Sequence, residues 1–176
     1  MKFIPAILVT TSFTLFHIGC STTRPSASPH RISAVLNSSA PYVALTKSER
    51  SRQAVGYGEL GVNRSGHGNP SLANRVCDEF FDAHADSLLE FAVPEGAKKF
   101  FGVGYTFSSS LSMEFIVKAD DKIIFQRRLF DEYPQKHVVV DVPIPKGAQR
   151  LTLVVDALGD KTADWSAWCW PRIYSK

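Results

Sequence analysis

Short runs in which apolar and polar residues alternate fill the second half of this 176-residue chain, and they constrain its fold more than any other feature. They span residues 111–118, 138–142 and 151–158. A period of two predicts β-strands that bury one face. Turn signals separate the strands, such as Pro94 to Gly96, and Asp120-Asp121 predicts a hairpin. No long helical period interrupts them. We therefore predict an all-β fold, an antiparallel β-sandwich.

The first twenty residues have the pattern of an export signal. Lys2 precedes a mostly apolar stretch from Phe3 to Phe16 that is too short to span a bilayer comfortably. A small residue then stands directly before Cys20, as in a bacterial lipobox, where the cysteine is lipidated. His17 replaces the usual Leu, so an ordinary cleaved signal with an incidental Cys20 is the alternative. Either way we expect an exported chain, in the periplasm or at the outer membrane or cell surface. If Cys20 is lipidated, we expect the lipid to anchor the chain to the membrane.

Composition divides the chain into three parts. Residues 1–19 read as the signal peptide. Residues 20–40 begin with a Ser-, Thr- and Pro-rich run that has little to bury, which predicts a disordered tether. Residues 41–176 remain for one folded domain. The formal net charge is only +3 and the basic residues are scattered, which argues against a nucleic-acid-binding protein.

Two cysteines, Cys77 and Cys169, lie within the predicted domain. In an oxidising compartment such a pair suggests a disulfide that joins the middle of the chain to its last strand. Two buried free thiols are the alternative, because the sequence does not give the separation of the two Cα atoms.

Acidic and indole side chains follow the strand at residues 151–158. Asp160, Asp164 and Trp165 fall in the loop after that strand. Carboxylates accept hydrogen bonds from sugar hydroxyls, while a flat ring contacts the apolar face of a pyranose, so this loop favours glycan binding. Trp168 and Trp170 share a face by parity and read as core residues, with Cys169 opposite them. Trp165 is the better candidate for an exposed platform.

A second polar segment contains Asp82, His84 and Asp86, followed by Ser87. In an extended chain the first three side chains share one face and Ser87 points away, which argues against a catalytic triad. They suit a metal site only if Asp160 or Asp164 joins them. A structural His84 that bonds a loop carbonyl is the plainer interpretation. We find no paired carboxylates or activated nucleophile, so we expect no enzyme.

A glycine-rich run at residues 56–61 is followed by no helical pattern and sits in no βαβ unit. This argues against a dinucleotide or phosphate loop. We expect the glycines to allow tight turns near the start of the domain.

The order of several motifs resembles the NPCBM/NEW2 family over residues 42–174. The matching segments are Phe81 to Ser87, Phe91 to Ala97, Phe100 to Gly104, Phe115 to Val117, Val140 to Val142, Leu151 to Asp160, and Asp164-Trp165. The resemblance implies a galactose-binding-like jelly-roll sandwich that recognises glycans through loops at one end. Some members carry a structural calcium ion, for which Asp160 and Asp164 are the candidates here.

The chain departs from the family at two places. Lys161-Thr162 stands where the family often has Asp-His, and Asp86 stands where it usually has Pro. We predict a non-catalytic carbohydrate-binding module presented at the cell envelope. Its candidate glycan contacts are Asp82, His84, Tyr105, Asp164 and Trp165. The alternative, favoured by Lys161-Thr162, is a structural or protein-interaction envelope lipoprotein that has lost sugar binding.

Overall fold

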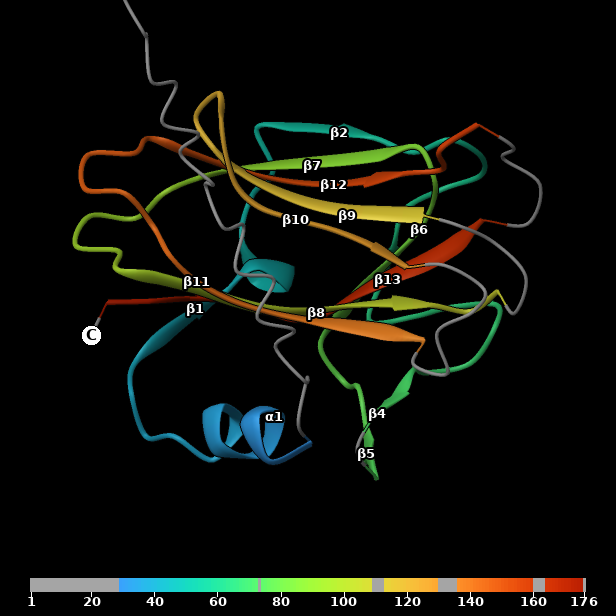
Figure 1. Ribbon diagram of the computed structural model, residues 1–176, viewed down its shortest axis with the longest axis horizontal. Coiled ribbons are helices and arrows are strands. Elements are labelled where there is room, and N and C mark those ends of the chain that lie inside the picture. The colour runs from blue at the N-terminus through green and yellow to red at the C-terminus, as the bar shows by residue number, and fades with distance from the viewer. Residues whose placement is uncertain (1–28, 73, 109–112, 130–135, 160–163, 176) are drawn as a thin grey trace, which may run out of the picture.

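The computed structural model describes residues 29–72, 74–108, 113–129, 136–159 and 164–175. These residues form two stacked antiparallel sheets, with one short helix packed outside them (Figure 1). The prediction of an all-β antiparallel sandwich is therefore confirmed. Cys20, the predicted signal peptide and Asp160 lie outside the described residues. Within the described part, no helix is long and apolar enough to cross a membrane.

The first sheet, here called sheet A, has one central path with an additional strand beside it. Its order is β11 (His137–Pro143), β8 (Lys99–Thr106), β13 (Trp165–Tyr174), β6 (Phe80–His84) and β3 (Gly61–Val62), and β1 (Tyr42–Ala44) pairs with β13. Sheet B has the order β10 (Lys122–Leu129), β9 (Met113–Ala119), β12 (Arg150–Asp156), β7 (Ser87–Ala92) and β2 (Arg52–Ala54). A small hairpin, β4 (Ser71–Leu72) and β5 (Arg75–Val76), and a 3-10 turn at Leu45–Lys47 complete the fold.

The main core lies between the two sheets. It takes Met113, Phe115 and Val117 from β9 and the apolar face of residues 151–157, as the alternation predicts. Trp168 of β13 is 1% exposed and packs edge-to-face on the Phe115 ring, with centroids 5.1 Å apart. Such a pair adds about 0.5–1.5 kcal/mol beyond the area that it buries. Each sheet thus buries one apolar face against the other sheet.

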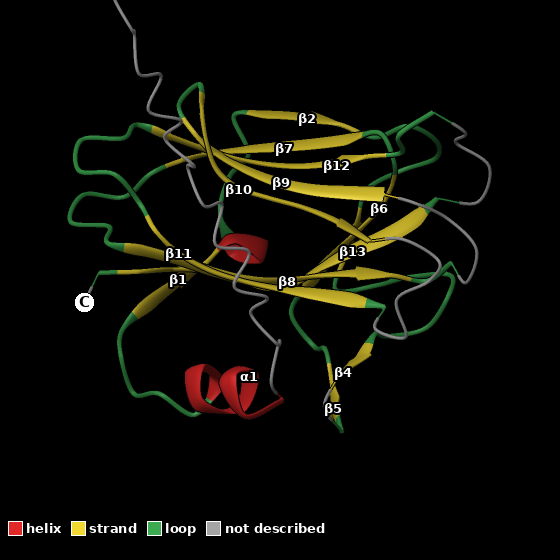
Figure 2. Ribbon diagram, viewed as in Figure 1, coloured by secondary structure: helices red, strands yellow, loops and turns green. Residues whose placement is uncertain are grey.

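A third layer covers the outer face of sheet A, and it corrects the disorder predicted for residues 29–36 (Figure 2). Residues 29–36 form helix α1 (Pro29–Leu36) instead of disordered chain. Ile32, Val35 and Leu36 recur at helical spacing and face the sheet, and Ile32 is fully buried. Arg31 adds an ion pair to Asp141 of β11, with Nη2 and Oδ2 3.1 Å apart. The helix forms because its apolar stripe has a surface to cover.

The irregular middle of β13 changes the predicted placement of one tryptophan. Its pairing with β8 shifts register between Cys169 and Arg172, and Trp170 adopts a φ of +46°. Trp168 therefore faces the main core, while Cys169 and Trp170 both belong to the outer cluster. The prediction that Trp168 and Trp170 share a face is wrong, because the irregularity shifts which face of the sheet the following side chains point to.

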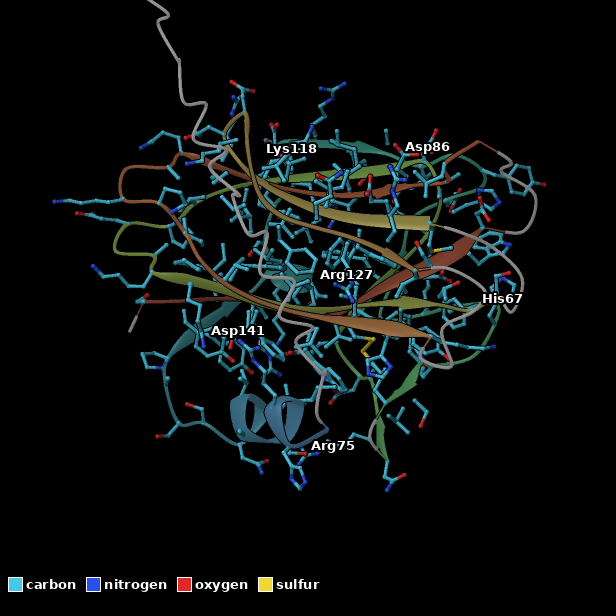
Figure 3. The ribbon with its side chains drawn as sticks, viewed as in Figure 1. His67, Arg75, Asp86, Lys118, Arg127 and Asp141 are labelled. Atoms are coloured by element: carbon cyan, nitrogen blue, oxygen red, sulfur yellow. A yellow bond between two sulfur atoms is a disulfide. The ribbon has the colours of Figure 1, made fainter. Side chains whose placement is uncertain are left out.

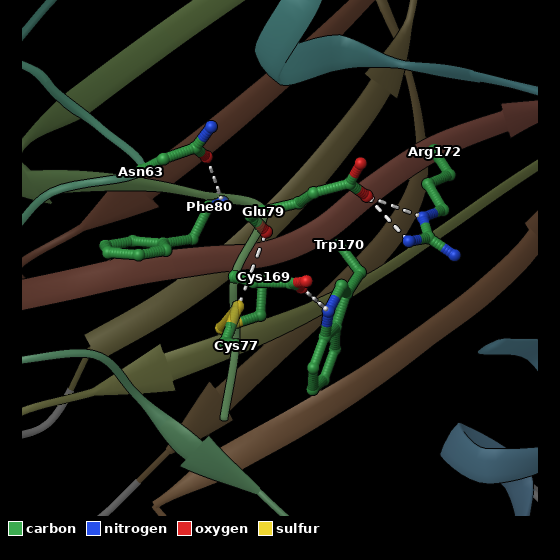
Figure 4. Close-up of a disulfide and its surroundings, with 8 residues drawn as sticks. Asn63, Cys77, Glu79, Phe80, Cys169, Trp170 and Arg172 are labelled. Atoms are coloured by element: carbon green, nitrogen blue, oxygen red, sulfur yellow. Dashed lines mark hydrogen bonds and ion pairs between the residues drawn. A yellow bond between two sulfur atoms is a disulfide. The ribbon is translucent and has the colours of Figure 1, made fainter. Parts of the chain in front are cut away.

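Cys77 and Cys169 form a disulfide inside this outer cluster (Figure 4). Their Cα atoms lie 5.9 Å apart and both residues are fully buried. Beside the bond, the Trp170 indole N–H donates to Asp78, and Arg172 pairs with Glu79. The segment before β6 is thus fastened to β13 by one covalent bond and two polar contacts.

Candidate functional site

The candidate site lies where β6 ends and β13 begins, at the end of the sandwich drawn on the right in Figure 1. Phe81 and Ala83 of β6 point into the main core, so Asp82 and His84 point to the opposite, outer face of sheet A. Trp165, the first residue of β13, is the Cα partner of His84. Strand pairing therefore brings together three of the predicted residues from segments eighty positions apart in the sequence.

An open cavity of about 350 Å³ adjoins these residues. It is lined by Glu59, Leu60, Gly61, Arg64, Ser65, Gly66, Asp82 and Trp165. This volume falls at the lower end of the range for small-molecule sites. The lining offers one aromatic ring, carboxylates and a guanidinium group, so the cavity has both hydrogen-bond acceptors and donors.

Asp82 is the buried polar group of this cavity. Only 4% of the residue is exposed, and its Oδ1 has no hydrogen-bond partner among the described residues. Burial raises the pKa of the Asp82 carboxyl, although a hydrogen bond with Ser65 and the charge of His67 act in the opposite direction. A buried oxygen without a partner costs free energy.

A row of aromatic rings crosses the site. Trp165 packs against His84 with ring centroids 5.1 Å apart and against His67 at 4.8 Å. Tyr57 also packs against His84, with ring centroids 5.9 Å apart. Figure 3 labels His67, which belongs to the loop after β3, at this same end of the molecule. The site is therefore an aromatic surface with a polar cavity beside it.

Hydrogen bonds fix His84 and the loop next to it. Nδ1 of His84 lies 2.6 Å from the carbonyl oxygen of Ala85, and a carbonyl only accepts, so Nδ1 carries the proton. The backbone N–H of Gly56 donates to the His84 carbonyl at 3.0 Å. A Cβ on Gly56 would clash with the Ala85 carbonyl, so only glycine lets this loop approach β6 so closely.

Two predicted contacts lie elsewhere. Asp164 adjoins Trp165 in sequence but is fully buried, and its carbonyl oxygen accepts from the Ala85 N–H at 2.9 Å. Its carboxylate is therefore not presented to a ligand. Tyr105 is half-buried on the outer face of sheet A, and its ring packs on Phe107, with centroids 5.2 Å apart. It does not line the cavity.

Of the two candidate calcium ligands, Asp160 lies outside the described residues. The described residues contain no group of three or more His, Cys, Asp or Glu side chains that could hold a metal. Asp86 of the predicted metal set instead accepts a hydrogen bond at Oδ1 from the Ala157 N–H, at 2.9 Å. That bond joins the turn before β7 to the end of β12, which is a structural role.

Several site residues carry no signal in the sequence. Tyr57 and Glu59 belong to the glycine-rich run that we interpreted only as turns. Ser65 and His67 follow in a polar, glycine-containing loop that has no periodicity. They reach Asp82 and Trp165 because β3 pairs with β6, and a two-residue strand is too short to be read from alternation. Asn63, which follows β3, also holds this loop to β6, because its Oδ1 accepts a hydrogen bond from the Phe80 N–H at 2.9 Å.

Comparison with known proteins supports both the fold and the family. Residues 42–174 match the NPCBM/NEW2 domain. No curated protein matches the sequence.

Solved structures with this fold include the CBM51 of a GH95 from Clostridium perfringens in complex with methyl-galactose. It has 21% identity and a TM-score of 0.64, over 76% of this chain and 99% of that one. The CBM51-2 and INT domains of Clostridium perfringens ZmpB, in complex with GlcNAc, have 18% identity and a TM-score of 0.62, over 76% of this chain and 31% of that one.

The tandem CBM51 modules of Sp3GH98 from Streptococcus pneumoniae have 14% identity and a TM-score of 0.67, over 96% of this chain and 52% of that one. This chain thus spans less than two thirds of the ZmpB and Sp3GH98 chains. At these identities the likeness establishes a shared fold.

Proposed function

Because the chain belongs to the NPCBM/NEW2 family, we propose that its sandwich is a non-catalytic module that binds a glycan in the cavity between Trp165 and Asp82. The observation that carries the proposal is the open cavity that Trp165 and Asp82 line together, which places an indole ring beside a carboxyl group. Sugar hydroxyls both donate and accept hydrogen bonds, so they suit the carboxyl and guanidinium groups that line this cavity. The Trp165 ring beside them supplies an apolar surface for the sugar ring.

The other cavity residues suit the same ligand. Glu59 and Arg64 stand at the open side, with Nη2 and Oε2 4.0 Å apart, so each retains capacity for hydrogen bonds to hydroxyls. An exposed ion pair of this kind contributes little to stability, and a ligand displaces it at small cost. The related structures with methyl-galactose and GlcNAc show neutral sugars on the same fold, which supports this choice of ligand class.

Presentation at the cell envelope forms the second part of the proposal. It rests on the apolar stretch before Cys20 and on the lipobox-like residues around it. Many copies held on one membrane would bind a multivalent glycan far more tightly than one site does. Mass spectrometry of the mature N-terminus tests this part. A diacylated Cys20 supports it, and an unmodified residue at another cleavage site contradicts it.

A glycan array followed by isothermal titration tests sugar binding. We expect a neutral mono- or oligosaccharide to bind residues 29–176, and Trp165→Ala and Asp82→Ala each to weaken binding by tenfold or more, about 1.4 kcal/mol. Ile123→Ala is the matched control, because Ile123 is an exposed apolar residue on β10 of the other sheet. Thermal melts confirm that each variant is folded.

The alternative function is that of an envelope protein that uses the sandwich to bind other proteins. Lys161-Thr162 is the observation that favours it, because these residues replace a family motif. Affinity capture from envelope extracts separates the two functions. Protein partners that remain after glycans are removed, together with an empty glycan array, would support the alternative and refute the sugar site.

A further inference from the structure

The loop at residues 56–59 presents an aromatic ring that the cavity does not use. Tyr57 is 70% exposed, the highest value among the large apolar side chains in the described part of the chain. Exposed tyrosines are typical of recognition surfaces, because the ring is apolar and its hydroxyl is polar. The ring lies beside His84 at a centroid distance of 5.9 Å, so it borders the site directly.

The loop holds Tyr57 in place from both sides. On one side the Gly56 N–H donates to the His84 carbonyl, and any side chain at residue 56 would collide with the Ala85 backbone. On the other side Gly58 adopts a φ of +70° and passes close to the Trp165 ring. Glu59, the next residue, lines the cavity. One short loop therefore carries the exposed tyrosine and also lines the cavity.

His84 is only 7% exposed and contacts both the exposed Tyr57 ring and the half-buried Trp165 ring. Its imidazole is T-shaped to Tyr57 and to Trp165, with interplanar angles of 68° and 88°. Because Nδ1 donates to the Ala85 carbonyl, Nε2 is the ring nitrogen that remains for a hydrogen bond to a ligand hydroxyl. A ring with a fixed tautomer between two aromatic surfaces suits the junction between two sugar residues, where hydroxyl donors lie close to the linkage.

We propose that Tyr57 forms a second sugar subsite and that the site takes at least two linked sugar residues, one at the Trp165 cavity and one on Tyr57, with His84 at their junction. This inference rests on the proposed function, since it extends the same site. It names the substrate class as an oligosaccharide or a glycan chain end instead of a single sugar. The glycine-rich run would then have a binding role and not only a turn role.

Isothermal titration tests the proposal with two ligands, the methyl glycoside of the sugar selected on the array and the shortest array oligosaccharide that ends in it. We expect wild-type protein to bind the oligosaccharide about tenfold more tightly. Tyr57→Ala should lower that affinity to the level of the methyl glycoside, so that the variant no longer distinguishes the two ligands. Tyr57→Phe keeps the ring and should retain most of the gain.

The outcomes separate the subsite from the cavity. Equal affinity of wild-type protein for the two ligands, with no effect of Tyr57→Ala, overturns the second subsite. The cavity proposal still stands in that case if Trp165→Ala weakens binding by tenfold or more. Failure of wild-type protein to bind either ligand overturns both proposals. Because Tyr57 is mostly exposed, its replacement should not unfold the domain, and a thermal melt checks this.

Discussion

Loss of the Cys77–Cys169 disulfide should be among the most destabilising changes in this domain. The bond joins residues 92 positions apart, so it removes a large part of the conformational freedom of the unfolded chain. The chain-entropy relation gives about 4.6 kcal/mol for a loop of this length at 25 °C. A domain of this size is stable by only about 5–15 kcal/mol, so the bond accounts for a large fraction of the total.

Urea unfolding measures this contribution. We expect protein that is reduced while unfolded and refolded in dithiothreitol to unfold at a urea concentration lower by roughly 2 M, for an m value of roughly 2 kcal/mol/M. The m value itself should rise, because an unfolded chain without the cross-link exposes more surface. The double variant Cys77→Ala/Cys169→Ala should lose slightly more, since both sulfur atoms are buried in the outer cluster.

The oxidised wild-type protein without reductant is the control. Equal urea midpoints for the oxidised and reduced forms would refute the reasoning, because the constraint on the unfolded chain would then have no measurable value. A change in midpoint with a constant m value would refute the part that concerns the unfolded state.

Three further predictions concern stability. Burial raises the pKa of Asp82, so the folded chain binds the Asp82 proton more tightly than the unfolded chain does. The resulting gain in folding stability is complete below pH 3.8 and is lost as the pH rises through the folded-state pKa. Urea unfolding at several pH values measures this pH dependence, and Asp82→Asn should remove it. Ile32→Ala should cost about 2–5 kcal/mol of helix docking, so limited proteolysis should cut near α1 while the sandwich keeps its melting transition. Gly104→Ala places a Cβ against the Phe115 ring in the main core and should destabilise by about 1–3 kcal/mol in chemical denaturation, and an unchanged midpoint would contradict the packing described here.

Alternation in the sequence predicts both the position and the buried face of strands in a sheet that is covered on one face only. In sheet B the core-facing residues alternate with residues that are mostly polar, so the strands at residues 113–117 and 151–157 can be read directly from the sequence. Sheet A is covered on both faces, and Phe100 and Phe101 are buried in different clusters. Such a strand is a continuous apolar run, which marks a strand but not its register.

Helix α1 could have been recognised from the spacing of Ile32, Val35 and Leu36, which is that of one helix face. The Ser- and Pro-rich residues before it concealed the pattern. The candidate site was only half predictable for a different reason. Asp82, His84 and Trp165 lie on recognisable strands, but Tyr57 and His67 reach them through loops whose paths depend on pairings of two or three residues.

The position of Trp165 at the head of β13 has a consequence for binding thermodynamics. That strand is the longest in the described chain, lies between β6 and β8, and is cross-linked four residues further on at Cys169. A ligand therefore meets an indole that is already immobilised, and association need not freeze the backbone beneath it. Affinity at this position should then depend on the quality of contact, with little entropic penalty from the protein.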